Sequence, residues 1–446
     1  MDSNNIIDFL KAKFLGQQTL SELLALTRDR SGYQREDAVR RLGKLGDPAF
    51  LADIIERAND WVPEVRKASY DAILNLCKPG NAPAFIAALP DFLHLEHCNR
   101  ADHSGLLGKI RDYLCNEEYR DLLISQMTAD DPRVAKMVCM LVMQKQFLGP
   151  EETMSRCLSH PDVIVRSMAA DSLRKLEDGP FNTFVDRALS DGFMPVRRES
   201  FQQLLTRDRA RGLDIARHFL FDNHSAIRTI ALSNLVSDGY DVVAIYDTAH
   251  ARAKRVKLIV CILWGWATLN SVTKAEEIKG YLVSKSSTLR RSALQALTKL
   301  SVKDAEPYLV TALKDDTRSV CADASRLILK LKIPLSAKQL VTIAQEAKTS
   351  HAVIACYTIA AKTNKWDWLQ VTLQLYMDEP SHEIRNLLAV QIKNWNNEFN
   401  KNAAQPTSQQ IGSLLTSVRH CADKIDSNQL ALLKFTLKGY DFSVPV

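Results

Sequence analysis

The chain has 446 residues, of which 46% are hydrophobic and 25% are charged, a composition that excludes a largely disordered protein. Its formal charge of +6 is well below the concentrated basic charge of a dedicated DNA-binding domain, although it permits contact with nucleic acid. The nine cysteines are odd in number, scattered and free of C-x-x-C pairs. They indicate reduced thiols at core positions of a cytoplasmic protein.

The first thirty residues predict capping helices rather than a targeting signal. Asp2 and Asp8 stand where a secretory signal would be basic, so export by that route is not expected. An amphipathic segment runs from Ile6 to Thr27 and predicts the helical start of the fold. We therefore expect N-terminal capping helices over residues 1–30.

A local pattern, an apolar residue that is followed in most copies by a basic one, recurs between residues 39 and 384. From Val134 onward the copies are 29 to 33 residues apart, and the 69-residue gap after Val65 predicts a degenerate repeat near His103. A short polar turn precedes each copy, which predicts helix–turn–helix units. The anchors of the pattern are Val39, Val65, Val134, Val165, Val196, Ile227, Val256, Leu289, Val320, Val353 and Ile384.

The second helix of each unit has one apolar face. In "HPDVIVRSMAADSLRKL", residues 160–176, Val165, Ala169, Leu173 and Leu176 follow the spacing of a helix buried on one side. Two helices of about a dozen residues cannot bury such faces alone, so neighbouring units must stack. The sequence predicts an all-α fold, an α-solenoid of about twelve helical hairpins over residues 31–395, with C-terminal capping helices over residues 396–446.

The longest apolar run is "LIVCILWGWATL", residues 258–269. It has twelve residues, whereas a transmembrane helix needs about twenty. The run predicts a buried helix, and no membrane partner is expected.

The segments "DDPRVAKMVCMLV", "DNHSAIRTIALSNLV" and "SSTLRRSALQALTKL" resemble HEAT repeats, in particular the short bacterial type of about thirty residues that also occurs in phycobilin lyases. The resemblance covers roughly residues 30–395 and implies a right-handed superhelix. It implies little about function, because such repeats build scaffolds, adaptors, chaperone-like lyases and a few DNA-repair enzymes.

The residue after the anchor is basic in eight of eleven copies: Arg40, Arg66, Arg166, Arg197, Arg228, Lys257, Arg290 and Arg385. One interpretation is a basic ladder that follows a phosphate backbone. The other is that these side chains pair with recurring aspartates of neighbouring layers, among them Asp60, Asp191 and Asp315. The resemblance to HEAT repeats favours the second interpretation.

One position further along, several copies are again basic, namely Arg41, Lys67, Arg198 and Arg291. An anionic partner would therefore meet the first half of the chain and the region around Arg290 and Arg291. A solvated helix face explains the same residues.

The degenerate repeat contains His94, His97, Cys98, His103 and Cys115. Such side chains suit zinc, but the paired spacing of a zinc site is missing, so no metal or cofactor is expected. A repeat that breaks the pattern is still a candidate for a specialised contact, which makes His94, His97 and His103 candidate binding residues.

Three tryptophans fall where exposure is plausible: Trp61 in "NDWVPEV", and Trp366 and Trp368 in "KWDW". Exposed aromatic residues at turns anchor protein partners, but tryptophans at such positions also pack adjacent layers together, and packing is the favoured interpretation here. "KWDW" superficially resembles the aromatic and aspartate set of HEAT-like alkylpurine DNA glycosylases. In those enzymes the set comes from different repeats, so the resemblance does not carry over to these residues. No nucleophile elbow or phosphate-binding glycine loop is present, and no enzyme is expected.

The function expected from the sequence is a non-enzymatic, cytoplasmic, bacterial scaffold or adaptor that binds a protein on the concave face of the solenoid. An immunity or antitoxin-like protein that blocks a toxin domain is a narrower hypothesis. The alternative is a nucleic-acid-binding protein, either a phosphate-backbone binder or one similar to the DNA glycosylases. The candidate binding residues are Arg41, Lys67, Arg198, Arg290, Arg291, Trp61, Trp366, Trp368, His94, His97 and His103.

Overall fold

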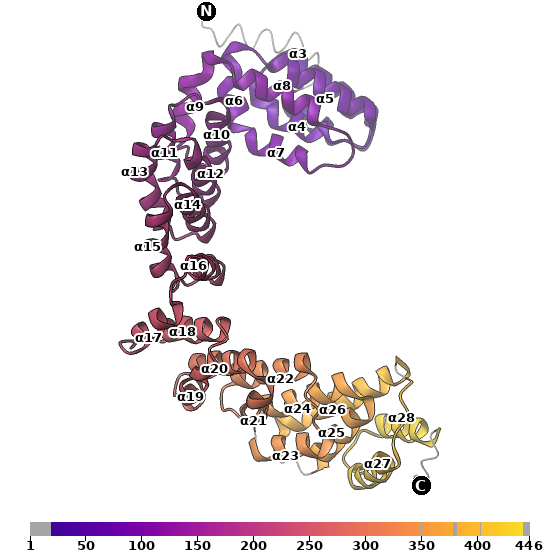
Figure 1. Cartoon of the computed structure of the whole chain (residues 1–446). Helices are drawn as coiled ribbons and strands as arrows, with labels where there is room; N and C mark the ends of the chain where they lie inside the picture. Colours follow the sequence, from indigo (N-terminus) through magenta and orange to yellow (C-terminus); the bar gives the residue numbers. More distant parts are fainter. Residues whose placement is uncertain (1–18, 348, 378–380, 402, 440–446) are drawn as a thin grey trace, which may run out of the picture. The chain divides into compact units, whose positions relative to one another are not determined.

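The computed structural model describes residues 19–347, 349–377, 381–401 and 403–439, so part of each predicted cap, residues 1–18 and 440–446, lies outside it. Within these ranges the regular structure is entirely helical, with 27 α-helices, several short 3₁₀ turns and no strand (Figure 1). The prediction of an all-α fold is confirmed for this part of the chain.

The chain divides into two compact units, residues 1–212 and 213–446. The helices of the first unit are α2 (Leu20–Leu26), α3 (Gly32–Leu45), α4 (Leu51–Ala58), α5 (Pro63–Leu76), α6 (Ala82–Ala87), α7 (Leu89–Glu96), α8 (Ser104–Leu114), α9 (Arg120–Gln126), α10 (Pro132–Lys145), α11 (Pro150–Cys157), α12 (Val163–Ser172), α13 (Asp178–Leu189) and α14 (Met194–Arg207). The boundary between the units falls within α15 (Arg209–Phe219).

The helices of the second unit are α16 (Ser225–Ser237), α17 (Val242–His250), α18 (Val256–Thr268), α19 (Ala275–Gly280), α20 (Ser287–Leu300), α21 (Val302–Ala312), α22 (Arg318–Leu331), α23 (Ala337–Ala347), α24 (Ser350–Thr363), α25 (Lys365–Met377), α26 (His382–Glu398), α27 (Ser408–Cys421) and α28 (Ser427–Lys438). The predicted end of the repeat array at residue 395 lies inside α26. The helices α27 and α28 lie in the predicted C-terminal cap.

The polar turns of the pattern start helices, as predicted. Asp162 accepts hydrogen bonds from the backbone N–H groups of Ile164 and Val165 and so caps α12. Pro63 and Pro132 are the first residues of α5 and α10, where the missing N–H has no helical partner to lose. The degenerate repeat near His103 contains α8, which begins directly after this histidine.

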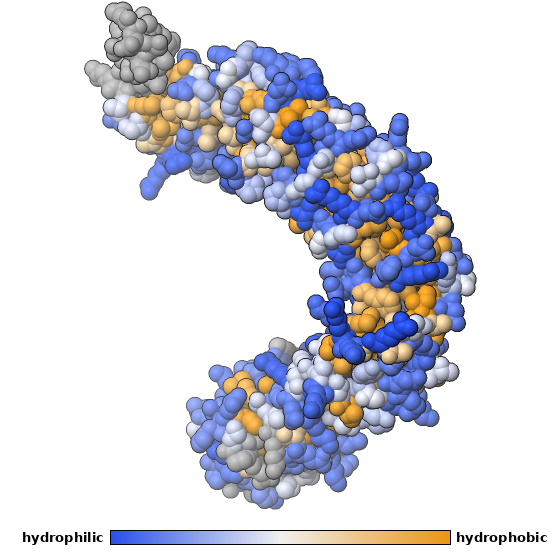
Figure 2. Space-filling model, turned by 90° about the vertical axis from the view of Figure 1, so that its left-hand side faces the viewer, coloured by the Kyte–Doolittle hydropathy of each residue, from blue (hydrophilic) through white to orange (hydrophobic). Residues whose placement is uncertain are grey.

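Within each unit, neighbouring helix pairs pack together through the predicted apolar face. In α12, Val165 and Ala169 are fully buried, and this helix packs against α11 and α14. In the second unit α18, α20, α22 and α24 contact one another in succession. Burial of each large aliphatic side chain contributes roughly 1.5–3 kcal/mol. Figure 2 shows polar residues over most of the visible surface, with small groups of hydrophobic residues between them.

The anchor predicted for the first repeat is wrong by five residues. Arg166 and Arg66 each lie four positions after the N-cap of their helix, and in α3 the residue four positions after the N-cap Ser31 is Arg35. Arg40 is instead exposed and pairs with Glu36. Arg35 and Arg66 are 31 residues apart, so the corrected anchor restores the regular spacing. Residues 35 and 39 share a helix face, which is why hydrophobicity alone did not distinguish them.

The apolar run at residues 258–269 forms most of α18, which is largely buried, as predicted; Trp266 within it is fully buried, whereas Trp264 is half-buried. Gly265 lets α17 approach closely, because a Cβ at this position would lie 2.2 Å from the Tyr246 ring. None of the helices in the described ranges combines the length and apolar character that a membrane-spanning segment needs.

Candidate functional site

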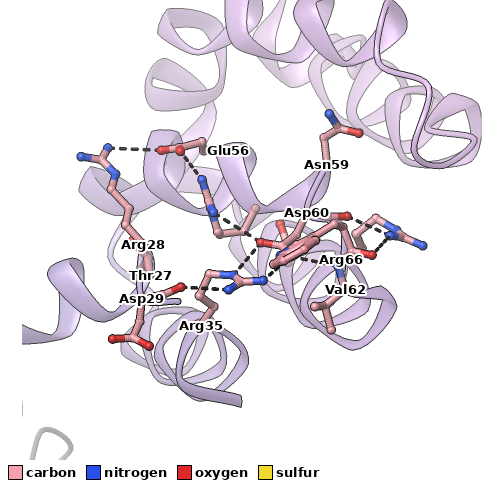
Figure 3. Close-up of polar contacts among 12 residues, drawn as sticks. Thr27, Arg28, Asp29, Arg35, Glu56, Asn59, Asp60, Val62 and Arg66 are labelled. Atoms are coloured by element: carbon pink, nitrogen blue, oxygen red, sulfur yellow. Dashed lines mark hydrogen bonds and ion pairs between the residues drawn. The ribbon is translucent and has the colours of Figure 1, made fainter. Parts of the chain in front are cut away.

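A groove with a volume of about 1040 Å³ lies around Trp61 in the first unit. Three separate segments form it: residues 28–35 before and at the start of α3, residues 52–61 of α4 and its following turn, and residues 91–100 of α7 and its following turn. Figure 3 shows the polar side chains of the first two segments meeting at Asp60.

A buried ion pair forms the floor of this groove. The Nε and Nη2 atoms of Arg35 each donate to a carboxylate oxygen of Asp60 at 2.8 Å, and the two side chains are only 4% and 2% exposed. The remaining Arg35 nitrogen donates to the carbonyls of Asp29 and Arg30. Burial by itself raises the pKa of Asp60, but hydrogen bonds from Arg35 and from the Val62 N–H outweigh it and hold the pKa below its usual value. Two turns of neighbouring layers are therefore tied together.

Trp61 lies next to this ion pair and is 71% exposed. Its ring centroid is 5.7 Å from the Arg35 guanidinium carbon. Its exposure agrees with the expectation from the sequence. A large aromatic side chain is thus held at the mouth of the groove, close to a fixed polar floor.

The charges along the groove balance. Five arginines line it together with five carboxylates, so its formal charge is zero: Arg28, Arg30, Arg35, Arg57, Arg100, Asp29, Asp53, Glu56, Asp60 and Asp91. Arg28 lies 3.2 Å from Glu56 and 3.5 Å from Asp53, and Arg57 lies 3.3 Å from Asp60. A groove of this composition offers no surplus charge to a phosphate.

Two polar atoms in the groove are buried and make no hydrogen bond within the described residues. They are the Nε–H donor of Arg57 and the side-chain oxygen of Asn59. The backbone carbonyl of Asn59 accepts a hydrogen bond from Arg100. A buried donor and a buried acceptor without partners are costly, and a ligand with a peptide group supplies the complementary pair.

The arginine pattern serves to join layers, which supports the structural interpretation of the repeated basic residues. Arg166 and Arg290 form bidentate pairs with Asp191 and Asp315, each 25 residues further along the chain. Each also donates to two backbone carbonyls of its own turn. Arg290 is therefore occupied within the protein, contrary to the idea that it contacts an anionic partner.

The other predicted basic residues are divided between paired and exposed positions. Arg291 pairs with Asp323 at 2.7 Å, and Arg41 lies 3.7 Å from Asp37. Lys67 and Arg198 are exposed and form no ion pair in the part of the chain that the structure describes. None of these four residues lines the Trp61 groove.

Trp366 and Trp368 are buried, which agrees with the favoured interpretation that they pack layers together and makes them unavailable as exposed binding residues. Trp366 is fully buried, its indole N–H donates to the Ala404 carbonyl, and its ring packs 5.8 Å from that of Trp395. Asp367 accepts a hydrogen bond from Gln410. The "KWDW" segment begins α25, whose helical turn directs its apolar residues into the packing with α26 and α27. These tryptophans pack layers together.

The three predicted histidines do not come together. His103 is buried and its Nδ1 lies 2.5 Å from the Tyr70 hydroxyl, whereas His94 and His97 are exposed. Of the three, only His94 lines the Trp61 groove. Across the described ranges no three His, Cys, Asp or Glu side chains are placed to hold a metal ion.

The sequence pattern did not predict Arg28, Arg57, Asn59 and Arg100 as members of the site. They lie outside the repeated positions, and only the packing of α4 against α7 brings their segments together. The one sequence feature that pointed to this groove was Arg35, because it lies at the regular 31-residue interval from Arg66. Comparison of the chain with protein-family models and with curated proteins finds no match.

Proposed function

We propose that the protein is a non-enzymatic scaffold or adaptor, and that the Trp61 groove holds a segment of a protein partner. The observation that carries this proposal is a 71% exposed tryptophan at the mouth of a groove of about 1040 Å³. Aromatic side chains that become buried against a partner contribute much of the binding energy at many protein interfaces. The unpartnered Arg57 Nε–H and Asn59 oxygen suit the carbonyl and N–H of a partner's main chain.

The same proposal includes the finer architecture. We infer that the helix pairs form a right-handed HEAT-type solenoid with about twelve units, and that partners bind its concave face. The 31-residue intervals from Arg35 to Arg66 and from Arg166 through Arg197 to Arg228 support a single repeat. A bacterial immunity protein that blocks a toxin domain would be one protein of this kind.

We place this function in the cytoplasm. The nine cysteines are all free thiols, and six of them are buried in the core. Burial raises the pKa of Cys77 and Cys321 to about 11, so these thiols stay protonated. Free thiols, most of them in the core, fit a reducing compartment.

Nucleic-acid binding by the predicted basic ladder is less well supported. Arg166, Arg290 and Arg291 are occupied by aspartates, and the groove around Trp61 has no net charge. Phosphate binding depends on unpaired cations and weakens steeply as the salt concentration rises.

The test compares wild-type protein with Trp61→Ala as bait in the cells that produce the protein. We expect a stoichiometric protein partner that wild type retains and Trp61→Ala loses, with retention little affected by salt. Tyr33→Ala is the matched control, because Tyr33 is an exposed aromatic residue of the same unit that does not line the groove. If both variants retain the same partner as wild type, the groove is not the binding site.

A further inference from the structure

One segment of the second unit carries more than the whole net positive charge of the protein. Residues 248–303 contain eleven Lys and Arg but only two acidic residues, Glu276 and Glu277, a formal charge of +9. The complete chain has a charge of +6, so the remainder is slightly negative. Charge that is concentrated in this way points to an anionic partner.

Much of this charge is exposed at one turn. Arg252, Lys254, Arg255 and Lys257 lie in the turn between α17 and α18 and in the first turn of α18. All four are exposed, and none forms an ion pair or a side-chain hydrogen bond with the residues that the structure describes. Lys285 occupies the corresponding turn before α20, which packs against α18, and it is also exposed. We call these five residues the basic turn cluster.

The repeat lacks its aspartate at this turn. Arg166 and Arg290 each pair with an aspartate 25 residues further on, but the residue 25 positions after Arg228 is Ala253. The local backbone is nevertheless the same. The Ala253 N–H donates to the carbonyl three residues before it, as the N–H groups of Asp191 and Asp315 do. Ala253 therefore occupies the sequence position, and shares the local backbone hydrogen bond, at which the other layers have a carboxylate.

Arg228 consequently forms no ion pair with any residue that the structure describes. It is only 7% exposed, and one of its terminal nitrogens donates to the carbonyls of Asp222 and Asn223, as in the other layers. Its Nε is buried and has no hydrogen-bond partner within the described ranges. The Trp264 ring, whose centroid is 4.7 Å from the guanidinium carbon, covers a face of the cation but supplies no negative charge. A buried cation without a counter-ion is unfavourable.

We propose that the basic turn cluster binds an acidic segment of a protein partner, and that a carboxylate of this segment takes the place of the missing aspartate beside Arg228. The other layers show which group such an arginine binds. Two of its nitrogen atoms donate to one carboxylate at 2.7–3.2 Å. The proposal extends protein binding to a second surface and rests on the proposed function. Its test uses this surface alone.

An acidic peptide fits the cluster better than a nucleic acid does. A phosphate backbone needs unpaired cations along several layers. In α20 the next two basic residues, Arg290 and Arg291, are held by Asp315 and Asp323. The basic turn cluster spans two adjacent turns, a length that suits a few consecutive Asp or Glu residues.

The experiment measures binding of a fluorescently labelled 12-residue peptide of alternating Glu and Gly by anisotropy at low salt. We expect binding to wild type and at least a tenfold loss with Lys254→Glu/Lys257→Glu. The control Lys109→Glu/Lys338→Glu makes the same change in net charge at two exposed lysines elsewhere and should bind within twofold of wild type. Equal loss in both double variants, or no binding of the peptide to wild type, overturns the proposal.

A second pair of variants tests the position beside Arg228. Ala253→Asp restores the carboxylate of the other layers, so it should raise the melting temperature and weaken peptide binding. Ala251→Asp adds the same charge two residues away and should have the smaller effect on both. If the two variants behave alike, Arg228 does not bind the partner's carboxylate.

If 12-nucleotide single-stranded DNA competes better than unlabelled peptide, the cluster is a nucleic-acid site and the proposal fails. Loss of partner capture by Trp61→Ala with intact peptide binding would separate the Trp61 groove from this site.

Discussion

The layers around Arg166 and Arg290 differ from the layer around Arg228 in the residue that lies 25 positions after the arginine. In the first two layers, the arginine forms an ion pair with an aspartate 25 residues further along the chain. In the third layer, this position is Ala253. All three arginines still donate to two carbonyls of their own turn. The comparison shows that a repeated arginine can be wholly structural in one layer and lack its counter-ion in another. The exposed cations gather at the layer that lacks the aspartate.

The largest expected effect is at the most buried pair of this type. Asp60→Ala would leave Arg35 buried without its carboxylate, so we expect a loss of about 3–5 kcal/mol in the free energy of unfolding, measured by urea denaturation. Asp53→Ala is the control, since its partner Arg28 is 66% exposed, and we expect it to lose no more than about 1 kcal/mol. Equal losses would mean that the carboxylate of Asp60 does not stabilise the layer.

The second prediction compares two arginines directly. Arg166→Met loses two carbonyl contacts and a bidentate aspartate, whereas Arg228→Met loses two carbonyl contacts and the stacking of its cation on Trp264. We expect Arg166→Met to be more destabilising by about 1–3 kcal/mol. Hydrogen exchange of amides in α12 and α16 reports each layer separately. A larger loss of unfolding free energy for Arg228→Met would show that the contact with Trp264 stabilises Arg228 at least as much as Asp191 stabilises Arg166.

The third prediction removes the difference between the layers. Ala253→Asp should stabilise the α16–α18 layer by about 1–2 kcal/mol, because the new carboxylate can accept from Arg228 and from the N–H two residues later, as Asp191 and Asp315 do. Slower amide exchange in α16 and α18, with α12 unchanged, is the expected measurement. Unchanged exchange in α16 would indicate that Ala253 is not equivalent to those aspartates.

The smallest and most gradual effect is that of pH. Burial alone raises the pKa of Asp191 and Asp315, but hydrogen bonds from Arg166 and Arg290 outweigh it and keep both pKa values below the usual one. Their stabilisation is therefore present above the unfolded pKa of about 3.9 and is lost as the pH falls through the folded pKa. Below about pH 4 we expect the α12–α14 layer to loosen in hydrogen exchange corrected for intrinsic rates. The α16–α18 layer should acquire this acid sensitivity only in Ala253→Asp.

The sequence predicted the helix pairs well because their signals are local. Polar turns such as Asp162 stop one helix and cap the next, and the spacing of Val165 and Ala169 marks the buried face. It failed in α3, where residues 35 and 39 share one helix face. The repeated basic residue was therefore placed at Arg40 instead of Arg35. For Trp366 the sequence favoured packing without deciding it, because the same polar start of a helix precedes either an exposed or a buried tryptophan, and only packing against Trp395 and Phe399 decides between them.

The sequence by itself determined the all-helical fold, the 31-residue interval and the positions of most second helices, since helix caps and apolar spacing act within a few residues. Only the tertiary structure decided which arginines are paired, because each pair joins residues 25 positions apart on different layers. It also decided that Trp61 is exposed beside a groove made of three segments. The absence of an aspartate at Ala253 was visible in the sequence, but its meaning depended on knowing what Arg166 and Arg290 contact.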